Sequence, residues 1–149
     1  MTTPVYLKVS KTIHHPLDKV WETVALEFGD VAKYNPEIKT SRFDPGQRRG
    51  IGTIRHCDFK NSGYIKEEII EWTDRQSFKL RCKESSVPLA HLESLFHFEA
   101  GNNQTTTVTQ EFWYRMKAPL GWMSGIMKKK MKATLINGLN GLENYLNQK

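Results

Sequence analysis

Hydrophobic residues recur with two different periods along this chain. From residue 5 to residue 13, Val5, Leu7, Val9 and Ile13 alternate with more polar neighbours, which is the two-residue period of a half-buried strand. Six further segments with strand character, separated by turn residues, are 38–43, 52–59, 64–73, 77–83, 91–99 and 105–116. Because these segments follow one another closely, we expect them to pair as antiparallel hairpins.

The last part of the chain has the spacing of a helix. Apolar residues recur at three- and four-residue steps through residues 119–148, which predicts one long amphipathic helix. At about 1.5 Å of rise per residue it would extend roughly 40 Å, enough to cross a whole sheet. Its first half carries Met123, Met127 and Met131, and its second half carries leucines. The flexible methionines either fill the core or cover a cavity.

Helical spacing also follows the first strand. Val20 and Val24 recur after Pro16, which predicts a short helix with proline in its first turn. Residues 28–30 end that helix, and residues 31–34 can form one further turn.

The order of these elements defines the expected architecture. One strand, two short helices, six strands and a long helix predict an α+β domain that spans residues 1–149. In this domain a curved seven-stranded antiparallel sheet wraps around the C-terminal helix, because that helix is the one element long enough to fill the concave face.

Composition adds limits to this picture. Hydrophobic residues make up 38% of the 149 residues and charged residues 26%, as is usual for one soluble globular domain. No apolar stretch approaches the length of a membrane span, so we expect a cytoplasmic protein without stable membrane insertion. Cys57 and Cys82 fit free thiols or a bridge equally well. The oligomeric state is left as monomer or homodimer.

The net charge of +6 is concentrated in one place. The chain has 22 basic and 16 acidic residues, and removing Lys128, Lys129, Lys130 and Lys132 leaves 18 against 16. The absence of a broad basic face argues against a nucleic-acid partner. The lysines are interpreted as a solvated helix face, and attraction to an anionic membrane surface or an acidic partner is the alternative.

Several local motifs resemble the helix-grip superfamily, which includes START-like (SRPBCC), Bet v 1-like, and polyketide cyclase/dehydrase and lipid-transport domains. The motifs are Val20-Trp21, YNPEI at 34–38, GIGTIR at 50–55 and YIKEEII at 64–70. The resemblance covers the whole chain and implies a curved sheet that grips the C-terminal helix around a hydrophobic cavity. Because function varies widely within the superfamily, it implies the fold more strongly than an activity.

Strand alternation selects the side chains that face this cavity. In the last two strands the more apolar set is Leu92, Ser94, Phe96, Phe98, Val108, Gln110, Phe112, Tyr114 and Met116. Alternation is ambiguous in the second to fourth strands, where the resemblance implies inward positions for Lys39, Ser41, Phe43, Arg55, Cys57, Phe59, Glu67 and Ile69. The helix is expected to contribute Met123 and Met127. Trp122 is either a lid over the cavity mouth or packs against the sheet edge.

The expected cavity has the composition of a small-molecule site. Apolar and aromatic side chains surround a few polar groups, which would fix the orientation of a ligand. Arg55 and Glu67 on neighbouring strands form either a structural ion pair or the polar end of the pocket. The plant abscisic-acid receptors of this superfamily contact their ligand through a strand-two lysine and a strand-four glutamate, and Lys39 and Glu67 resemble that pair in position.

The sequence lacks a recognisable motif for nucleophilic, metal or cofactor chemistry. Cys57 and Cys82 have no histidine partner at a catalytic spacing, and the histidines lack metal-ligand spacing. The leading hypothesis is a carrier or binder of a hydrophobic small molecule or lipid. The alternative is a polyketide cyclase/dehydratase-like enzyme or hydrolase that uses Glu67 or Arg55 in the same cavity. A co-chaperone-type interaction module is a third possibility within the superfamily.

Overall fold

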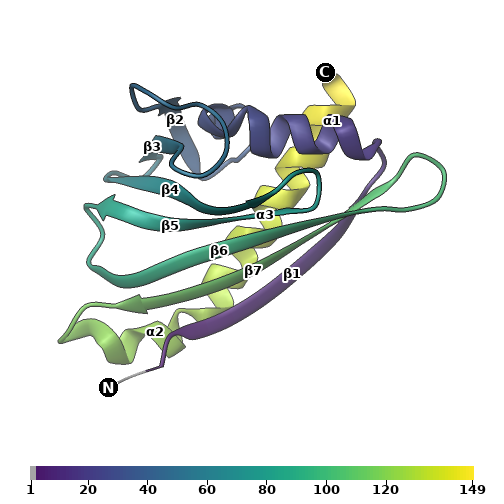
Figure 1. Ribbon diagram of the computed structural model, residues 1–149. Coiled ribbons are helices and arrows are strands. Elements are labelled where there is room, and N and C mark those ends of the chain that lie inside the picture. Colours follow the sequence, from purple (N-terminus) through teal and green to yellow (C-terminus); the bar gives the residue numbers. More distant parts are fainter. Residues whose placement is uncertain (1–2) are drawn as a thin grey trace.

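In the computed structural model, which describes residues 3–149, one curved antiparallel sheet wraps around the C-terminal helix (Figure 1). Its seven strands lie in the order β1-β7-β6-β5-β4-β3-β2. The strands are β1 (Val5–Ile13), β2 (Ile38–Phe43), β3 (Ile54–Phe59), β4 (Tyr64–Thr73), β5 (Ser77–Ser85), β6 (Leu89–Ala100) and β7 (Thr106–Met116). The helices are α1 (Leu17–Trp21), the π-helical η1 (Glu22–Leu26), the 3-10 helices η2 (Phe28–Lys33) and η3 (Leu120–Trp122), α2 (Met123–Ile126) and α3 (Lys128–Gln148). The predicted helix-grip architecture is confirmed.

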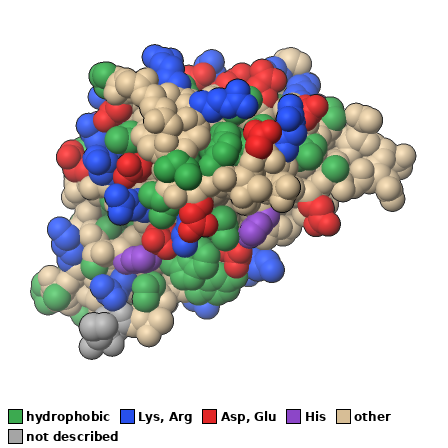
Figure 2. Space-filling view, in the orientation of Figure 1, with side chains coloured by type: hydrophobic (Ala, Val, Ile, Leu, Met, Phe, Trp, Pro, Cys, Tyr) green, Lys and Arg blue, Asp and Glu red, His purple; other side chains and the backbone are tan. Residues whose placement is uncertain are grey.

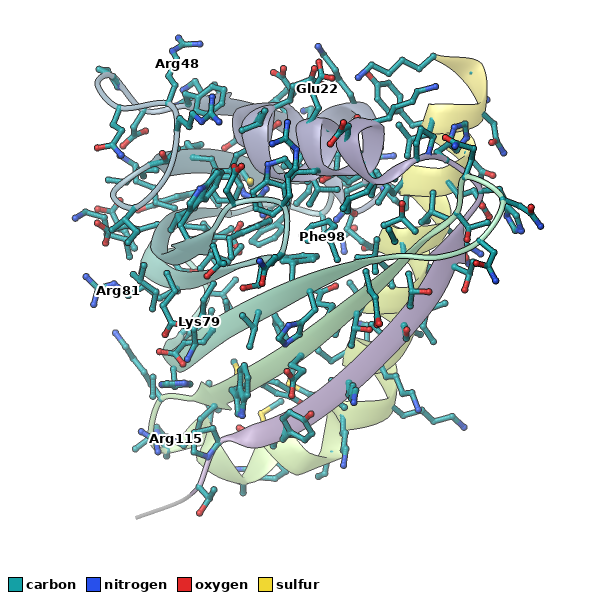
Figure 3. The ribbon with its side chains drawn as sticks, turned by 45° about the vertical axis from the view of Figure 1, so that its right-hand side comes forward. Glu22, Arg48, Lys79, Arg81, Phe98 and Arg115 are labelled. Atoms are coloured by element: carbon teal, nitrogen blue, oxygen red, sulfur yellow. The ribbon has the colours of Figure 1, made fainter. Side chains whose placement is uncertain are left out.

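The first helices pack against one end of the sheet through aromatic rings. Trp21 is buried, and its ring lies edge-on to Phe98 of β6 and Trp72 of β4, with centroid distances of 5.1 Å and 5.0 Å. Figure 3 shows Phe98 on the side of β6 that faces these helices. Edge-to-face packing of this kind adds to the burial of apolar area. It fixes α1 and η1 on the sheet and makes them one wall of the interior.

Helix α3 crosses the concave face of the sheet and fills its centre. Leu135, Leu139, Leu142 and Leu146 recur at three- and four-residue steps, and all four side chains are buried. Burying one leucine side chain stabilises a fold by roughly 1.5–3 kcal/mol. The leucine half of the predicted helical stripe is therefore the part that holds helix and sheet together.

The methionine half of the stripe is not part of one uninterrupted helix. The prediction of a single helix over residues 119–148 is wrong, because η3 and α2 precede α3 and the helix is interrupted at Met127. The Ser124 carbonyl accepts a hydrogen bond from the Tyr114 hydroxyl (2.5 Å), and the Ser124 hydroxyl accepts one from the Met116 amide (2.9 Å). Through these two hydrogen bonds Ser124 attaches α2 to β7. The helical hydrogen-bond pattern nevertheless continues across the interruption, because the Met127 amide donates to the Met123 carbonyl and the Met131 amide donates to the Met127 carbonyl.

The outer face of the sheet carries side chains of both charges, with hydrophobic side chains between them (Figure 2). Lys79 lies 3.2 Å from Glu93 and 5.2 Å from the centroid of the Trp113 ring, and His97 lies 2.9 Å from Glu111. Figure 3 shows Lys79 pointing away from the interior. Glu93 and His97 of β6 therefore lie on the face opposite the inward set Leu92, Ser94, Phe96 and Phe98. Within the described residues, no helix is long and apolar enough to cross a membrane.

Gly141 marks the closest approach between α3 and the segment after η2. A Cβ atom at this position would overlap the Tyr34 carbonyl oxygen and would lie 3.1 Å from Pro36. At Gly125, by contrast, a Cβ atom would meet no heavy atom within 4 Å. Gly141 is therefore required by packing, although glycine is unfavourable within a helix.

We expect Gly141→Ala to lower the free energy of unfolding by about 1–3 kcal/mol, because the added methyl group forces backbone apart. The matched variant Gly125→Ala should leave stability unchanged or raise it by up to about 1 kcal/mol through its higher helix propensity. Urea unfolding followed by circular dichroism measures both. Equal stability changes in the two variants would contradict the role assigned to Gly141.

Candidate functional site

A cavity of about 310 Å³ lies between the concave face of the sheet, η2 and the part of α3 up to Leu142. Its volume falls at the lower end of the range for small-molecule pockets. Most of the lining is apolar: Phe78, Leu80, Leu92, Phe96 and Phe112 come from the sheet, and Met127, Met131 and Leu135 come from the helix side. Leu139 and Leu142 of α3 line it too, so the cavity extends along the helix from Met127 to Leu142, and Leu146 packs beyond it.

Arg55 and Glu67 form the strongest polar feature of the lining. They are direct cross-strand neighbours on β3 and β4, and both are largely buried. The Arg55 Nε and Nη2 atoms each lie 2.8 Å from the same carboxylate oxygen, Glu67 Oε1. Among residues 3–149, the second oxygen, Oε2, has no hydrogen-bond donor. The pair therefore neutralises its own charge and still leaves an acceptor at the cavity wall.

Helix residues hold the guanidinium of Arg55 in place. Its Nη1 donates to the Phe28 carbonyl (3.1 Å), and its Cζ lies 4.0 Å from the centroid of the Phe28 ring. Burial acts to lower the pKa of Arg55, but the neighbouring Glu67 carboxylate, with smaller contributions from Cys57 and Tyr34, outweighs this effect, and the pKa is raised above its ordinary value. Arg55 thus stays cationic inside an apolar pocket.

Tyr34 and Cys57 complete this polar end as neutral groups. Burial raises the pKa of Tyr34 and that of Cys57 to about 12 each, although the nearby Arg55 acts in the opposite direction. At neutral pH both groups keep their protons. A thiolate is the reactive form of cysteine, so this buried thiol is a poor nucleophile.

A second polar group lies on β6 and β7. Gln110 donates through Nε2 to the Ser94 hydroxyl (2.9 Å), and both side chains are buried and line the cavity. This pair satisfies part of its own hydrogen-bonding capacity within an otherwise apolar wall.

Ten of the fifteen residues proposed from the sequence line this cavity: Arg55, Cys57, Phe59, Glu67, Leu92, Ser94, Phe96, Gln110, Phe112 and Met127. They come from β3, β4, β6, β7 and the interruption before α3. The other five, Lys39, Phe43, Tyr114, Trp122 and Met123, lie elsewhere.

Lys39 is exposed, so its predicted inward orientation is wrong. Ile38 pairs with Phe59 and Thr40 pairs with Asp58, which leaves Lys39 as an extra residue at a β-bulge. A bulge reverses the side-chain parity on one side of it. Ile38 therefore takes the inward position at the start of β2 that the family resemblance implied for Lys39.

Phe43 and Tyr114 stabilise the scaffold around the cavity. The Phe43 ring packs onto Gly29, and Arg48 stacks over it at 4.9 Å. Figure 3 shows Arg48 at the edge of the molecule beside η2 and β2. Tyr114 is completely buried and directs its hydroxyl to the Ser124 carbonyl.

Trp122 and Met123 lie in the short helices before α3. Trp122 is 68% exposed, so it neither packs against the sheet edge nor lines the cavity. Met123 is half-buried at the start of α2 and is also outside the lining.

The sequence reasoning missed Tyr34, Phe78 and Leu80 as lining residues. Phe78 and Leu80 alternate with polar residues in β5, so strand parity was a signal that could have found them. Tyr34 follows η2, where neither period applies. Within residues 3–149, no three histidine, cysteine or acidic side chains are grouped so as to hold a metal ion.

Comparison with solved structures shows the same fold in proteins of low sequence identity. A START superfamily protein from Mycobacterium smegmatis superposes with a TM-score of 0.82 at 16% identity, over 96% of this chain and 97% of that one. The ginseng major latex-like protein 151 from Panax ginseng gives 0.74 at 15% identity, over 97% and 98% of the two chains. The protein XoxI from Bacillus cereus gives 0.74 at 16% identity, over 94% of each chain.

Comparison of sequences identifies the family. No curated protein sequence matches the chain. The profile of one family, described as polyketide cyclase / dehydrase and lipid transport, matches residues 5–147. Because this profile matches almost the whole chain and the structure has the helix-grip fold, the chain belongs to the polyketide cyclase/dehydrase and lipid transport family.

Proposed function

We propose that the protein binds an apolar small molecule or lipid in the cavity between the sheet and α3. The observation that carries this proposal is the cavity of about 310 Å³, whose lining is mostly apolar and includes two polar pairs, Arg55–Glu67 and Ser94–Gln110. Such a pocket derives affinity from buried apolar area and orientation from a few polar contacts. Arg55, Glu67 and Tyr34 would contact the polar end of a ligand, and Phe96, Phe112 and Met127 its apolar body.

The setting of the protein is part of the same proposal. Cys57 and Cys82 are both free thiols, which fits the reducing conditions of the cytoplasm. We expect a monomer or homodimer that needs no cofactor to bind its ligand.

A second candidate function is catalysis in the same cavity, of the cyclase or dehydratase type. The observation that favours it is the Oε2 atom of Glu67, which lacks a hydrogen-bond donor among residues 3–149 while Oε1 is held by Arg55. A carboxylate oxygen in this state could accept a proton from a bound ligand. The Arg55 guanidinium would stabilise negative charge that develops on that ligand.

We expect Phe112→Trp to weaken uptake of the apolar dye Nile red at least about tenfold, because the indole occupies space that the dye needs. Fluorescence titration of the dye measures the change, and circular dichroism verifies the fold. The control Tyr6→Trp makes a similar exchange on the outer face and should bind the dye normally. Undiminished uptake by the Phe112 variant would place the dye outside this cavity.

We expect Glu67→Gln to separate the two candidate functions. Without the carboxylate, Arg55 loses its partner and can pair with an anionic ligand, so a fatty acid should bind about tenfold more tightly while Nile red binding stays the same. Displacement titrations measure both. For an enzyme, loss of the base should reduce turnover of a polyketide-like substrate by about 10²–10⁴-fold.

The exposed exchange Glu99→Gln is the matched control, because Glu99 is a solvent-facing residue of β6. Unchanged fatty-acid affinity in the Glu67 variant would show that Arg55 does not contact the ligand head group. Unchanged turnover would remove Glu67 from the chemistry.

A further inference from the structure

A stripe of side chains, apolar except for one lysine, faces outward along η3, α2 and the start of α3. We define the outward stripe as Trp122, Ile126, Lys129, Ala133 and Ile136. These positions recur at three- and four-residue steps, and all five side chains are exposed. Trp122 is 68% exposed and Ile126 is 73% exposed, although the opposite side of the same helices packs onto β7 and the cavity.

Lysines surround this stripe without acidic neighbours in the sequence. Residues 117–142 contain five lysines and no aspartate or glutamate. Within residues 3–149, Lys128, Lys129, Lys130 and Lys132 form no ion pair. On the outer face of the sheet, by contrast, lysine and histidine side chains are paired with carboxylates. The segment is therefore a local cationic surface with exposed apolar side chains at its centre.

We propose that the outward stripe and its lysines dock the protein onto the surface of an anionic lipid bilayer. Amphipathic helices bind such surfaces by burying apolar side chains among the head groups while lysines contact anionic lipids. Tryptophan is favoured at this depth because its ring is apolar and its N–H remains near water. The segment lies parallel to the surface, since α2 and α3 are too polar to cross a bilayer.

Charge and side-chain type favour a bilayer over other partners. A second copy on the same stripe would bring two sets of lysines together, and like charges repel. A nucleic acid would pair with the lysines but would leave Ile126 and Ile136 in contact with phosphates or water. An anionic bilayer satisfies both the charge and the apolar area.

The position of the stripe also places the cavity at the bilayer surface. Met127, Lys130 and Met131 line the cavity from the same turns that carry Ile126 and Lys129 on their outer side. Figure 1 shows α2 at the end of the molecule away from the C-terminal end of α3, so docking there leaves the first helices in solvent. The proposed docking involves exposed residues and does not depend on what the cavity binds.

The test uses the full chain and vesicles of phosphatidylcholine with or without phosphatidylserine, separated by sedimentation. We expect binding to the anionic vesicles alone, and loss of binding near 1 M salt, where the Debye length falls to about 3 Å. The triple variant Lys128→Gln, Lys129→Gln and Lys132→Gln should bind on the order of 100-fold more weakly, at about fivefold per lysine. The double variant Trp122→Ser and Ile126→Ser should also lose at least about tenfold.

Two controls match these changes elsewhere on the surface. Ile51→Ser removes an isoleucine that is 59% exposed in the connection between β2 and β3, and Lys8→Gln removes an exposed lysine from β1. Both should bind vesicles as the unmodified chain does. Circular dichroism and Nile red uptake verify that every variant keeps its fold and its cavity.

Several results would overturn the proposal. They are failure to bind anionic vesicles at low salt, equal binding by the unmodified chain and both stripe variants, or an equal loss in the two controls. Conversion of a dimer to a monomer by the Trp122 and Ile126 changes, with vesicle binding unaffected, would assign the stripe to a second copy. Retention by DNA without vesicle binding would assign the lysines to nucleic acid.

Discussion

The contact between the leucines of α3 and the concave face of the sheet is the interaction on which the rest of the structure depends. A curved sheet leaves a groove that one helix can fill only where the side chains are large and regular. Leu135, Leu139, Leu142 and Leu146 meet this condition at one end of the groove. Toward the other end the helix is preceded by methionines and short helices, and a cavity remains between the sheet and residues 127–142, so that Leu135, Leu139 and Leu142 both pack the core and line the cavity.

Burial in this groove sets the chemistry of its polar groups. Arg55 keeps its charge because Glu67 and the Phe28 carbonyl and ring surround it, and Tyr34 and Cys57 keep their protons because burial disfavours their anions. A single oxygen of Glu67 receives both donors of Arg55. The pocket is therefore electrically balanced without a ligand, and affinity for a charged ligand would require a rearrangement of this pair.

Much of this arrangement could be predicted from two periodicities. Strand alternation located the inward side chains of β6 and β7, because each of these strands has one face on the interior and one in solvent. The inward position that the family resemblance implied for Lys39 was wrong, because a bulge that depends on pairing with β3 shifts the parity of β2. Helical spacing located the leucines but not the interruption at Met127, which accompanies hydrogen bonds from β7 that no local pattern encodes. Tyr34 was not predicted as a lining residue because it lies between η2 and β2, in a segment with neither strand alternation nor helical spacing.

The absence of a side chain at Gly141 has a consequence for variation within such a fold. Because α3 lies close to the Tyr34 carbonyl at Gly141, the helix cannot move closer to the segment after η2 without steric overlap, and it cannot move away without losing this packing. The packing at Gly141 thus fixes the position of α3 relative to the segment after η2. Met127 and Met131 line the cavity away from this contact, so changes in their size can alter the volume of the cavity while the position of the helix is kept.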